Sequence, residues 1–258
     1  QEAFAPLEEY QVKEALHFSN AGGVYLALHE GKKVVLKEGR QQAGLDTNLK
    51  DGFARVENEA EILRQLADLT GVVNYLDDFT SWRHHFLVEE YIAGQSLEEL
   101  LATEFPFVVG DLEKKARYKA KAIKILEQLK ELLKQIHARG LAVGDLSLSN
   151  TLVTEDGDVR LIDLENAGKA TEKYVPGLTT VGFVSWAAKT YAEADDFALA
   201  RIAYYLFLPV IPVADLAPDI IAKQEKWIGG YFGQDLVQFL RKIAGNMQAS
   251  EPIFLKKP

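Results

Sequence analysis

Two short polar segments separated by a hairpin pattern constrain the fold of this chain most strongly. Asp145 and Asn150 lie five residues apart in the first segment, and Asp163 follows eighteen residues after Asp145. The residues between them include two short β-rich runs, 151–154 and 159–162, which flank a Glu-Asp-Gly turn. A hairpin reverses the chain, so Asp163 at its exit should approach Asn150 at its entrance. Two converging oxygen ligands suit Mg²⁺, and Asp145 is a candidate to accept a proton from an incoming hydroxyl group.

The first third of the chain indicates β-strands with one helix among them. Apolar residues that recur every three or four positions predict a helix over residues 53–69, with Gly71 as its stop. We interpret Asp77-Asp78 as a turn and His84-His85 as an exposed loop before a strand. Strands are expected at residues 10–18, 24–28, 33–37, 72–76 and 86–91.

From Ala93-Gly94 onward the pattern becomes helical. An apolar stripe from Ala122 to Ile136 predicts one long helix that stops at Gly140. The longest apolar run, residues 202–213, is too short to span a bilayer and contains two prolines, so we expect a buried helix and its exit. The sequence therefore predicts an α+β fold with a β-rich lobe at 1–93 and a helical lobe at 94–258.

Composition narrows the classes of partner and compartment. The net charge of −9 makes tight nucleic-acid binding a poor expectation. The chain has no cysteine, which excludes disulfides, thiolate metal sites and a cysteine nucleophile. No signal peptide or membrane segment is recognised, and we expect a cytoplasmic protein. Because the sequence begins with Gln rather than Met, we also expect it to be part of a longer protein.

The segment from Asp145 to Asn150 together with Asp163 resembles the catalytic core of the protein-kinase-like superfamily, H-R-D-x-x-x-x-N followed by D-F-G. The resemblance implies a two-lobed kinase fold. It also implies that Asp145 is the catalytic base and that Asn150 and Asp163 hold Mg²⁺ beside a nucleoside triphosphate.

Further residues occur in the order that this resemblance requires. Lys37 ends the third expected strand, where the family has its nucleotide lysine, and Glu59 stands in the helix whose glutamate pairs with that lysine. Glu57 and Glu61 on the same helix compete with Glu59 for this role.

The resemblance also suggests nucleotide-binding backbone segments. Gly22 and Gly23 occupy the glycine-loop position, although two glycines could equally serve only to turn a hairpin. Glu90 to Ile92 resembles the segment between the lobes whose backbone meets the adenine. Asp195 resembles the aspartate that braces the catalytic loop from the central helix of the large lobe.

A narrower resemblance covers nearly the whole chain. The segments that carry it are 17–25, 37–40, 144–147, 161–165 and 207–209, and they are similar to the central kinase domain of class III lanthipeptide synthetases. That family implies phosphorylation of Ser and Thr side chains of a ribosomal precursor peptide, with ATP or GTP and Mg²⁺. Separate lyase and cyclase domains, which we expect outside this chain, then eliminate the phosphate and close thioether rings.

Departures from the general kinase pattern keep two alternatives open. Gly144 replaces the arginine before the catalytic aspartate, so we expect activity without phosphorylation of residues 164–184. The Gly144-Asp145 pair is also seen in small-molecule kinases of the aminoglycoside or choline type. Glu165 replaces the glycine of D-F-G, and this change, with the sparse glycine loop, points toward a non-catalytic pseudokinase module. The intact set of Lys37, Asp145, Asn150 and Asp163 argues against that module.

Two further features have two interpretations each. Residues 38–51 form either a peptide-recognition insert or an ordered loop. A run of basic residues on the long helix forms either an electropositive face for an acidic leader peptide or a solvated helix face. That run comprises Lys114, Lys115, Arg117, Lys119, Lys121 and Lys124.

Overall fold

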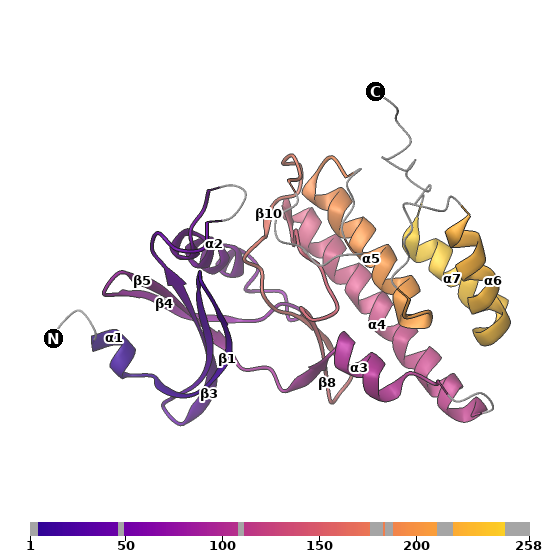
Figure 1. Ribbon diagram of the computed structural model, residues 1–258, viewed down its shortest axis with the longest axis horizontal. Helices are drawn as coiled ribbons and strands as arrows, with labels where there is room; N and C mark the ends of the chain where they lie inside the picture. The colour runs from indigo at the N-terminus through magenta and orange to yellow at the C-terminus, as the bar shows by residue number, and fades with distance from the viewer. Residues whose placement is uncertain are drawn as a thin grey trace. The chain divides into compact units, whose positions relative to one another are not determined.

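The structure, a computed structural model, describes residues 5–45, 49–107, 111–175, 183, 188–210 and 219–245. Two compact units make up the chain. Unit 1 comprises Gln1–Ala93 and Arg160–Gly168, and unit 2 comprises Gly94–Val159 and Lys169–Pro258. A β-sheet dominates unit 1 and helices dominate unit 2 (Figure 1), which confirms the predicted α+β class.

Unit 1 is built on a five-stranded sheet. Its strands are β1 (Gln11–Ser19), β2 (Gly22–His29), β3 (Lys32–Arg40), β4 (Tyr75–Ser81) and β5 (His84–Glu90), in the order β1-β2-β3-β5-β4. Each neighbouring pair in this sheet is antiparallel. Antiparallel order with short turns is what the alternating hairpin pattern of the sequence predicts.

The two faces of this sheet have different partners. One face carries an apolar cluster, against which Leu7 of helix α1 (Ala5–Glu8) packs. The buried members of the cluster are Tyr10, Ala27, Val34, Leu36, Phe86 and Val88. Because side chains alternate along a strand, Lys37 of β3 points to the other face, on which helix α2 (Gly52–Gln65) packs.

Helix α2 begins at a side-chain cap and ends earlier than predicted. Asp51 accepts a hydrogen bond from the Ala54 N–H at 2.9 Å, and it also accepts one from the Gln42 N–H at 2.7 Å. The helix ends at Gln65, where the Leu66 N–H turns back onto the last carbonyls. The described ends of the 38–51 segment are therefore ordered against the start of α2, while residues 46–48 lie outside the described residues.

The strand predicted at residues 72–76 begins only at Tyr75, so this prediction was wrong over its first half. Val72 and Val73 pair instead with the segment 160–168. The Leu161 N–H donates to the Gly71 carbonyl at 2.8 Å, and the Val73 N–H donates to the Leu161 carbonyl at 2.9 Å. Backbone groups that would have paired within the sheet are satisfied by this distant segment.

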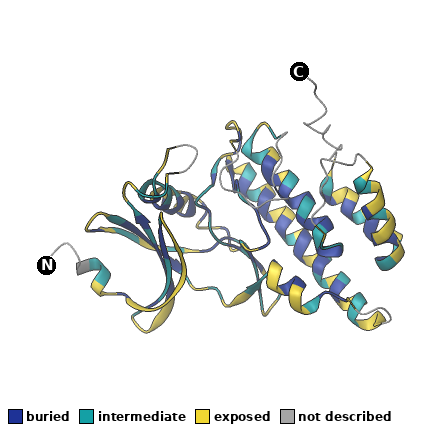
Figure 2. Cartoon of the chain, viewed as in Figure 1, coloured by how far each residue is buried: buried dark blue, intermediate teal, exposed yellow. Residues whose placement is uncertain are grey.

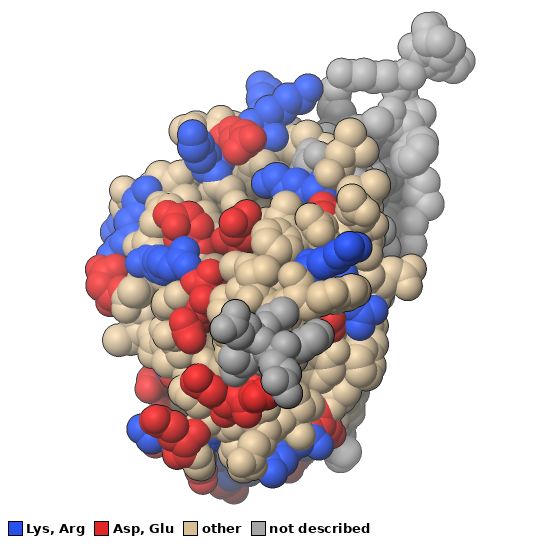
Figure 3. All heavy atoms as spheres, turned by 90° about the vertical axis from the view of Figure 1, so that its left-hand side faces the viewer, with Lys and Arg blue, Asp and Glu red and all other residues tan. Residues whose placement is uncertain are grey.

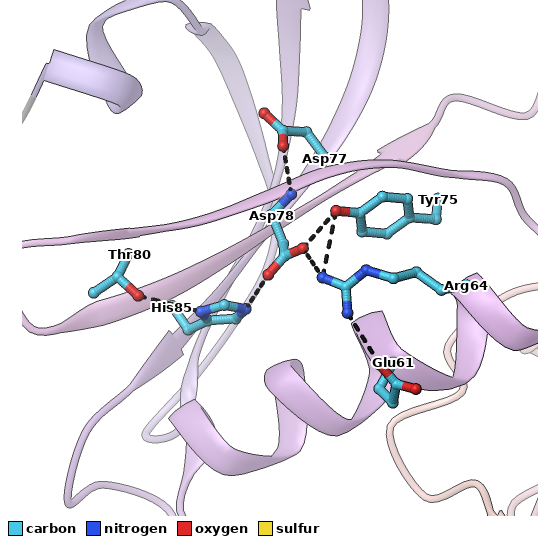
Figure 4. Close-up of polar contacts among 7 residues, drawn as sticks. All are labelled: Glu61, Arg64, Tyr75, Asp77, Asp78, Thr80 and His85. Carbon is cyan, nitrogen blue, oxygen red and sulfur yellow. Dashed lines mark hydrogen bonds and ion pairs between the residues drawn. The ribbon is translucent and has the colours of Figure 1, made fainter.

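The predicted Asp77-Asp78 turn and exposed His84-His85 loop were also wrong, because these residues lie within β4 and β5. Asp78 accepts hydrogen bonds from Arg64 of α2 and from the Tyr75 hydroxyl, and it lies 3.0 Å from Nε2 of buried His85 (Figure 4). Burial raises the pKa of Asp78, but these donors outweigh it and the pKa is lowered. Side-chain partners thus let two polar pairs enter strands that composition alone disfavours.

Unit 2 contains the longer helices and several short strands. Its core is formed by α4 and α5, whose buried faces pack against each other (Figures 1 and 2). Strands β9 and β10 include residues at which the chain passes from one unit to the other. The elements are β6 (Gly94–Ser96), α3 (Leu97–Glu104), α4 (Leu112–Ala138), β7 (Leu141–Ala142), β8 (Thr151–Thr154), β9 (Val159–Leu161), β10 (Gly168–Lys169), α5 (Tyr191–Phe207), α6 (Ile220–Phe232) and α7 (Gln234–Ala244).

The long predicted helix is confirmed as α4. Its apolar stripe is buried, and burying one leucine side chain contributes about 1.5–3 kcal/mol. Gly140 follows the helix with φ of +75°, a backbone conformation that glycine adopts without strain. The stripe comprises Ala122, Leu126, Leu129, Leu133 and Ile136.

The apolar run that begins at Ile202 belongs to α5, which ends at Phe207, and residues 211–213 of the run lie outside the described residues. Most of the second half of the 164–184 segment lies outside them as well. Across the ranges that the structure describes, no helix combines the length and the apolar character needed to cross a bilayer.

The basic residues of α4 are largely used within unit 2. Lys115 Nζ donates to the Tyr231 carbonyl at 2.9 Å and Lys119 Nζ to the Phe232 carbonyl at 2.8 Å, so both cap the C-terminus of α6. Lys121 Nζ contacts Glu104 at 2.6 Å. These contacts weigh against a free electropositive face at these three lysines.

Charged side chains elsewhere are mixed in sign. On the face of the molecule drawn in Figure 3, Lys and Arg are interspersed with Asp and Glu. Among the described residues of that face, no broad basic patch is seen, in keeping with the net charge of −9.

Candidate active site

An ion cluster in unit 1, centred on a buried lysine, brings together three of the predicted site residues. Lys37 of β3 is 8% exposed, and its Nζ lies 2.7 Å from Oε1 of Glu59 and 3.2 Å from Oδ1 of Asp163. Glu59 belongs to α2 and is fully buried. Residues that are far apart in the sequence, on a strand, a helix and the 160–168 segment, therefore meet at one ammonium group.

Helix periodicity decides which glutamate of α2 takes part. Glu59 lies on the same buried stripe as Val56 and Ala60, whereas Glu57 and Glu61 are exposed. The Glu59 Oε1 atom also accepts the Leu164 N–H at 2.7 Å. Glu59 thus fixes both the lysine and the backbone that follows Asp163.

Lys37 keeps its positive charge within this cluster. Burial pushes the pKa of Lys37 down, but the negative charges of Asp163 and Glu59 outweigh burial and hold the pKa well above its ordinary value. Lys37 therefore stays a cation at every physiological pH. Burial raises the pKa of Glu59, an effect that the charge of Lys37 partly offsets.

The segment that carries Asp163 is held in an unusual backbone conformation. Asp163 has φ of +61°, a backbone region that residues other than glycine adopt at a cost of about 1–3 kcal/mol. Glu165, which replaces the glycine of D-F-G, lies 3.6 Å from Arg55 of α2. Its carboxylate thus serves as an anchor to α2.

Glu90, the first residue of the predicted adenine-binding backbone, is held by several hydrogen bonds. The Glu90 carboxylate accepts the Asn74 N–H at 2.8 Å and a hydrogen bond from the Arg160 guanidinium. The Glu90 N–H donates to the Asn74 carbonyl at 3.1 Å. Sequence reasoning missed Arg160, because an arginine in a short strand gives no signal of its own. Adenine binding by the backbone of Glu90 and Ile92 stays a prediction.

Gly22 and Gly23 lie within β2, paired with β1 and, across the sheet, with β3. A Cβ atom at Gly22 would stand 1.6 Å from the Glu38 carbonyl oxygen, and one at Gly23 would stand 2.4 Å from the Tyr25 hydroxyl oxygen. Close backbone approach accounts for glycine at position 22 without any ligand. Phosphate binding by these residues stays a prediction.

The catalytic-loop candidate of unit 2 is braced by one buried aspartate. Asp195 of α5 is 1% exposed and accepts the Val143 and Gly144 N–H groups, each at 2.8 Å. Its Oδ2 atom also lies 2.9 Å from Nε2 of His137. Gly144 has φ of +81°, a left-handed backbone conformation. Glycine adopts this conformation without the strain that an arginine would have at the same φ. Sequence reasoning missed His137, which gives no signal in the last turn of a helix.

Asp145 and Asn150 are linked through the loop backbone. The Asn150 Nδ2 group donates to the Asp145 carbonyl at 3.3 Å, and the Asn150 N–H donates to Oγ of Ser147 at 3.2 Å. The amide oxygen of Asn150, the atom that a hard cation takes, is not used in either bond. Burial and the negative charge of Asp145 raise the pKa of Tyr174 to about 12, so this tyrosine is a further neighbour of the loop that sequence reasoning missed.

The structure therefore forms two groups of candidate residues, one in each unit. Lys37, Glu59 and Asp163 meet in unit 1, and Asp145 and Asn150 are joined in unit 2. The predicted metal ligands Asn150 and Asp163 fall in different units, so their pairing stays a prediction. Within the described ranges, no three His, Cys, Asp or Glu side chains form a metal-binding group.

Comparison with known proteins identifies the family. Residues 10–216 match the protein kinase domain. A probable SapB synthase of Streptomyces coelicolor is 37% identical over 78% of this chain and 22% of its own length. The serine/threonine-protein kinase shk2 of Schizosaccharomyces pombe is 23% identical over 98% of the chain and 39% of its own length.

The chain spans well under half the length of these curated relatives. The match to a synthase and to kinases agrees with the resemblance to the kinase domain of class III lanthipeptide synthetases. The kinase-family match covers most of the chain, including the buried Lys37–Glu59 pair and the Asp145 loop. The chain belongs to the protein kinase family.

Proposed function

We propose that this kinase domain transfers the terminal phosphoryl group of ATP or GTP to Ser and Thr hydroxyls of a precursor peptide. The observation that carries the proposal is the Lys37–Glu59–Asp163 cluster, in which the buried ammonium group of Lys37 contacts the carboxylates of buried Glu59 and of partly exposed Asp163. A lysine fixed in this way, with its charge protected from titration, is suited to neutralise phosphate oxygens.

The residues present fit a nucleotide with Mg²⁺. Lys37 would face the α/β-phosphates, and the Asn150 amide oxygen and the Asp163 carboxylate are the oxygen ligands that Mg²⁺ prefers. Mg²⁺, when bound, would neutralise charge on the phosphates. In the same proposal, the backbone of Glu90 and Ile92 meets the purine, and Gly22 and Gly23 lie over the phosphates.

Asp145 would orient the acceptor hydroxyl and take its proton. A positioned general base contributes about 10²–10⁴-fold to the rate, and positioning with charge neutralisation supplies most of the remainder. Glu59 acts through Lys37, since its Oε1 atom lies 2.7 Å from the lysine Nζ. Asp195 acts through the loop, since it holds the two N–H groups directly before Asp145.

The class of acceptor is supported by the relatives. The probable SapB synthase and the serine/threonine kinase are both similar to this chain. Together with the resemblance to lanthipeptide synthetases, they favour a peptide acceptor. Lyase and cyclase domains acting on the same peptide are the partners that the proposal implies, and a cytoplasmic location would supply the nucleoside triphosphate.

A small-molecule acceptor of the aminoglycoside or choline type is the second candidate, and the Gly144-Asp145 pair is the observation that favours it. Mass spectrometry separates the two. The chain is incubated with Mg²⁺ and ATP or GTP, together with a Ser/Thr-rich precursor peptide, an aminoglycoside and choline. The proposal expects phosphoryl groups on the peptide alone, whereas transfer only to a small molecule would contradict it.

A further inference from the structure

A third carboxyl group lies beside the buried lysine of unit 1. Glu89 of β5 is 2% exposed, and its Oε1 atom lies 3.6 Å from Nζ of Lys37. Sequence reasoning passed over Glu89 because it follows the apolar run Phe86-Leu87-Val88 and precedes the expected adenine-binding backbone. It is a charged residue type at a position where the strand pattern requires an apolar one.

Sheet register explains why the two side chains meet. Lys37 is the partner of Leu87, and Glu89 is the partner of Val35, in the antiparallel pairing of β3 with β5. Lys37 and Glu89 are therefore diagonal neighbours on one face of the sheet, within reach of two long side chains. On the other side of Glu89, its partner in β4 is Tyr75, whose hydroxyl group donates to Asp78.

Hydrogen-bond capacity around the lysine is incomplete. An ammonium group has three N–H donors, and Lys37 donates two hydrogen bonds, one to Glu59 and one to Asp163. Among the described residues, the buried Oε1 atom of Glu89 has no hydrogen-bond partner. A movement of a few tenths of an ångström would bring it within hydrogen-bond distance of Nζ.

Charge balance determines how Glu89 takes part. Glu59 and Asp163 already supply two negative charges to one buried cation, a net charge of −1, and a third ionised carboxylate would bring the sum to −2 around the buried Lys37 side chain. Burial raises the pKa of Glu89 to about 8. The positive charge of Lys37 opposes this rise, and the negative charges of Glu59 and Asp163 add to it. At neutral pH Glu89 is therefore mainly the neutral acid, which leaves Lys37 available to another anion.

We propose that Glu89 is a positioning residue for Lys37. The buried carboxyl group of Glu89 fixes the position of the Lys37 ammonium group for the nucleotide phosphates and leaves the positive charge of Lys37 in place. This inference rests on the proposed function, since it assigns Lys37 to those phosphates. The charged groups facing Glu89 are Lys37 from β3, Glu59 from α2 and Asp163 from the 160–168 segment.

The test measures the Kd of Mg–nucleotide for the whole chain by calorimetry at pH 7, 8 and 9. Glu89→Leu removes the acceptor and should raise the Kd at pH 7 about tenfold, and Glu89→Gln should recover most of that loss. Because the pKa of Glu89 is raised to about 8, its neutral fraction falls between pH 7 and pH 9, and the Kd of the native chain should rise over that range. Glu89→Gln should lack this rise. Titration of the nucleotide phosphates is the same for both proteins, so the difference between the two Kd profiles reports Glu89 alone.

A second measurement needs no nucleotide. Because the pKa of Glu89 is raised on folding, its contribution to stability is complete below the unfolded pKa and is lost as the pH rises through the folded pKa. The native chain should therefore lose stability to urea between pH 6 and pH 9 relative to Glu89→Gln. Glu57→Gln, an exposed glutamate on α2, is the matched control and should follow the native chain in both measurements.

The outcomes separate this inference from the proposed function. Parallel pH profiles for the native chain and Glu89→Gln, or an unaltered Kd in Glu89→Leu, would overturn the role of Glu89 alone. If the native chain binds no Mg–nucleotide, the proposed function and this inference fall together. If Lys37→Met abolishes binding while every Glu89 variant is silent, the proposed function stands and the positioning role does not.

Discussion

The replacement of Asp195 by alanine should weaken unit 2 by a measurable and calculable amount. The carboxylate is 1% exposed and accepts two buried backbone N–H groups at 2.8 Å, besides its contact with His137. Each buried donor left unpaired costs about 1–3 kcal/mol, so two donors cost about 2–6 kcal/mol. Relief from burying the carboxylate offsets part of this, and we expect a net loss of about 3 kcal/mol.

Urea unfolding followed by circular dichroism measures this loss. With a urea dependence of about 3 kcal/mol per molar, the midpoint should fall by about 1 M. Asp235→Asn is the matched control, because Asp235 is an exposed carboxylate with a single lysine contact at 2.7 Å, and such pairs contribute under about 1 kcal/mol. A loss below about 1 kcal/mol in Asp195→Ala would refute the reasoning that the loop N–H groups depend on this side chain.

Three further predictions concern single contacts. Gly22→Ala should lower the free energy of unfolding by at least about 2 kcal/mol in thermal unfolding, because the added Cβ atom would stand 1.6 Å from a carbonyl oxygen. Gly230→Ala is the control, because Gly230 is a helical glycine with open space around it, and this change should raise the free energy of unfolding by up to about 1 kcal/mol. Burial lowers the pKa of His137, but Asp195 outweighs it and the pKa is raised above 6.5, so this contribution to stability should be complete below pH 6.5 and lost as the pH rises through the folded pKa. His137→Gln should remove that slope from unfolding free energies measured between pH 5.5 and 8.5. Charge reversal of Lys115 and Lys119 together should cost about 1–2 kcal/mol in urea unfolding, since both cap α6, and an unchanged midpoint would favour a solvated helix face.

Periodicity and local turn chemistry were sufficient to predict the main elements that carry Lys37 and Glu59, and the long helix. The strands around Lys37, the helix with Glu59 and the long helix α4 each carry a strong alternating or 3.6-residue pattern. The same periodicity separates Glu59 from Glu57 and Glu61 once the buried stripe of α2 is known. Local patterns do not encode long-range partners, and for that reason the predicted strand at residues 72–76 was wrong at Val72, which pairs with Leu161.

Buried polar residues were the part that sequence reasoning could not place. His85 looks like a surface residue by composition, yet it is buried, and its Nε2 atom lies 3.0 Å from Oδ2 of the half-buried Asp78. Glu89 follows an apolar run in its strand, and its burial is compensated by Lys37 in the neighbouring strand. Such residues are recognised only when the partner that compensates their burial is known.

The nucleotide-binding role of the Lys37–Glu59–Asp163 cluster is tested most directly by calorimetric titration of Mg–ATP and Mg–GTP into the native chain, Lys37→Met, Asp163→Asn and Asp145→Asn. We expect binding that needs Mg²⁺ in the native chain, little loss in Asp145→Asn, a weaker complex in Asp163→Asn and none in Lys37→Met. Equal affinities in the native chain and Lys37→Met, with or without Mg²⁺, would contradict this account.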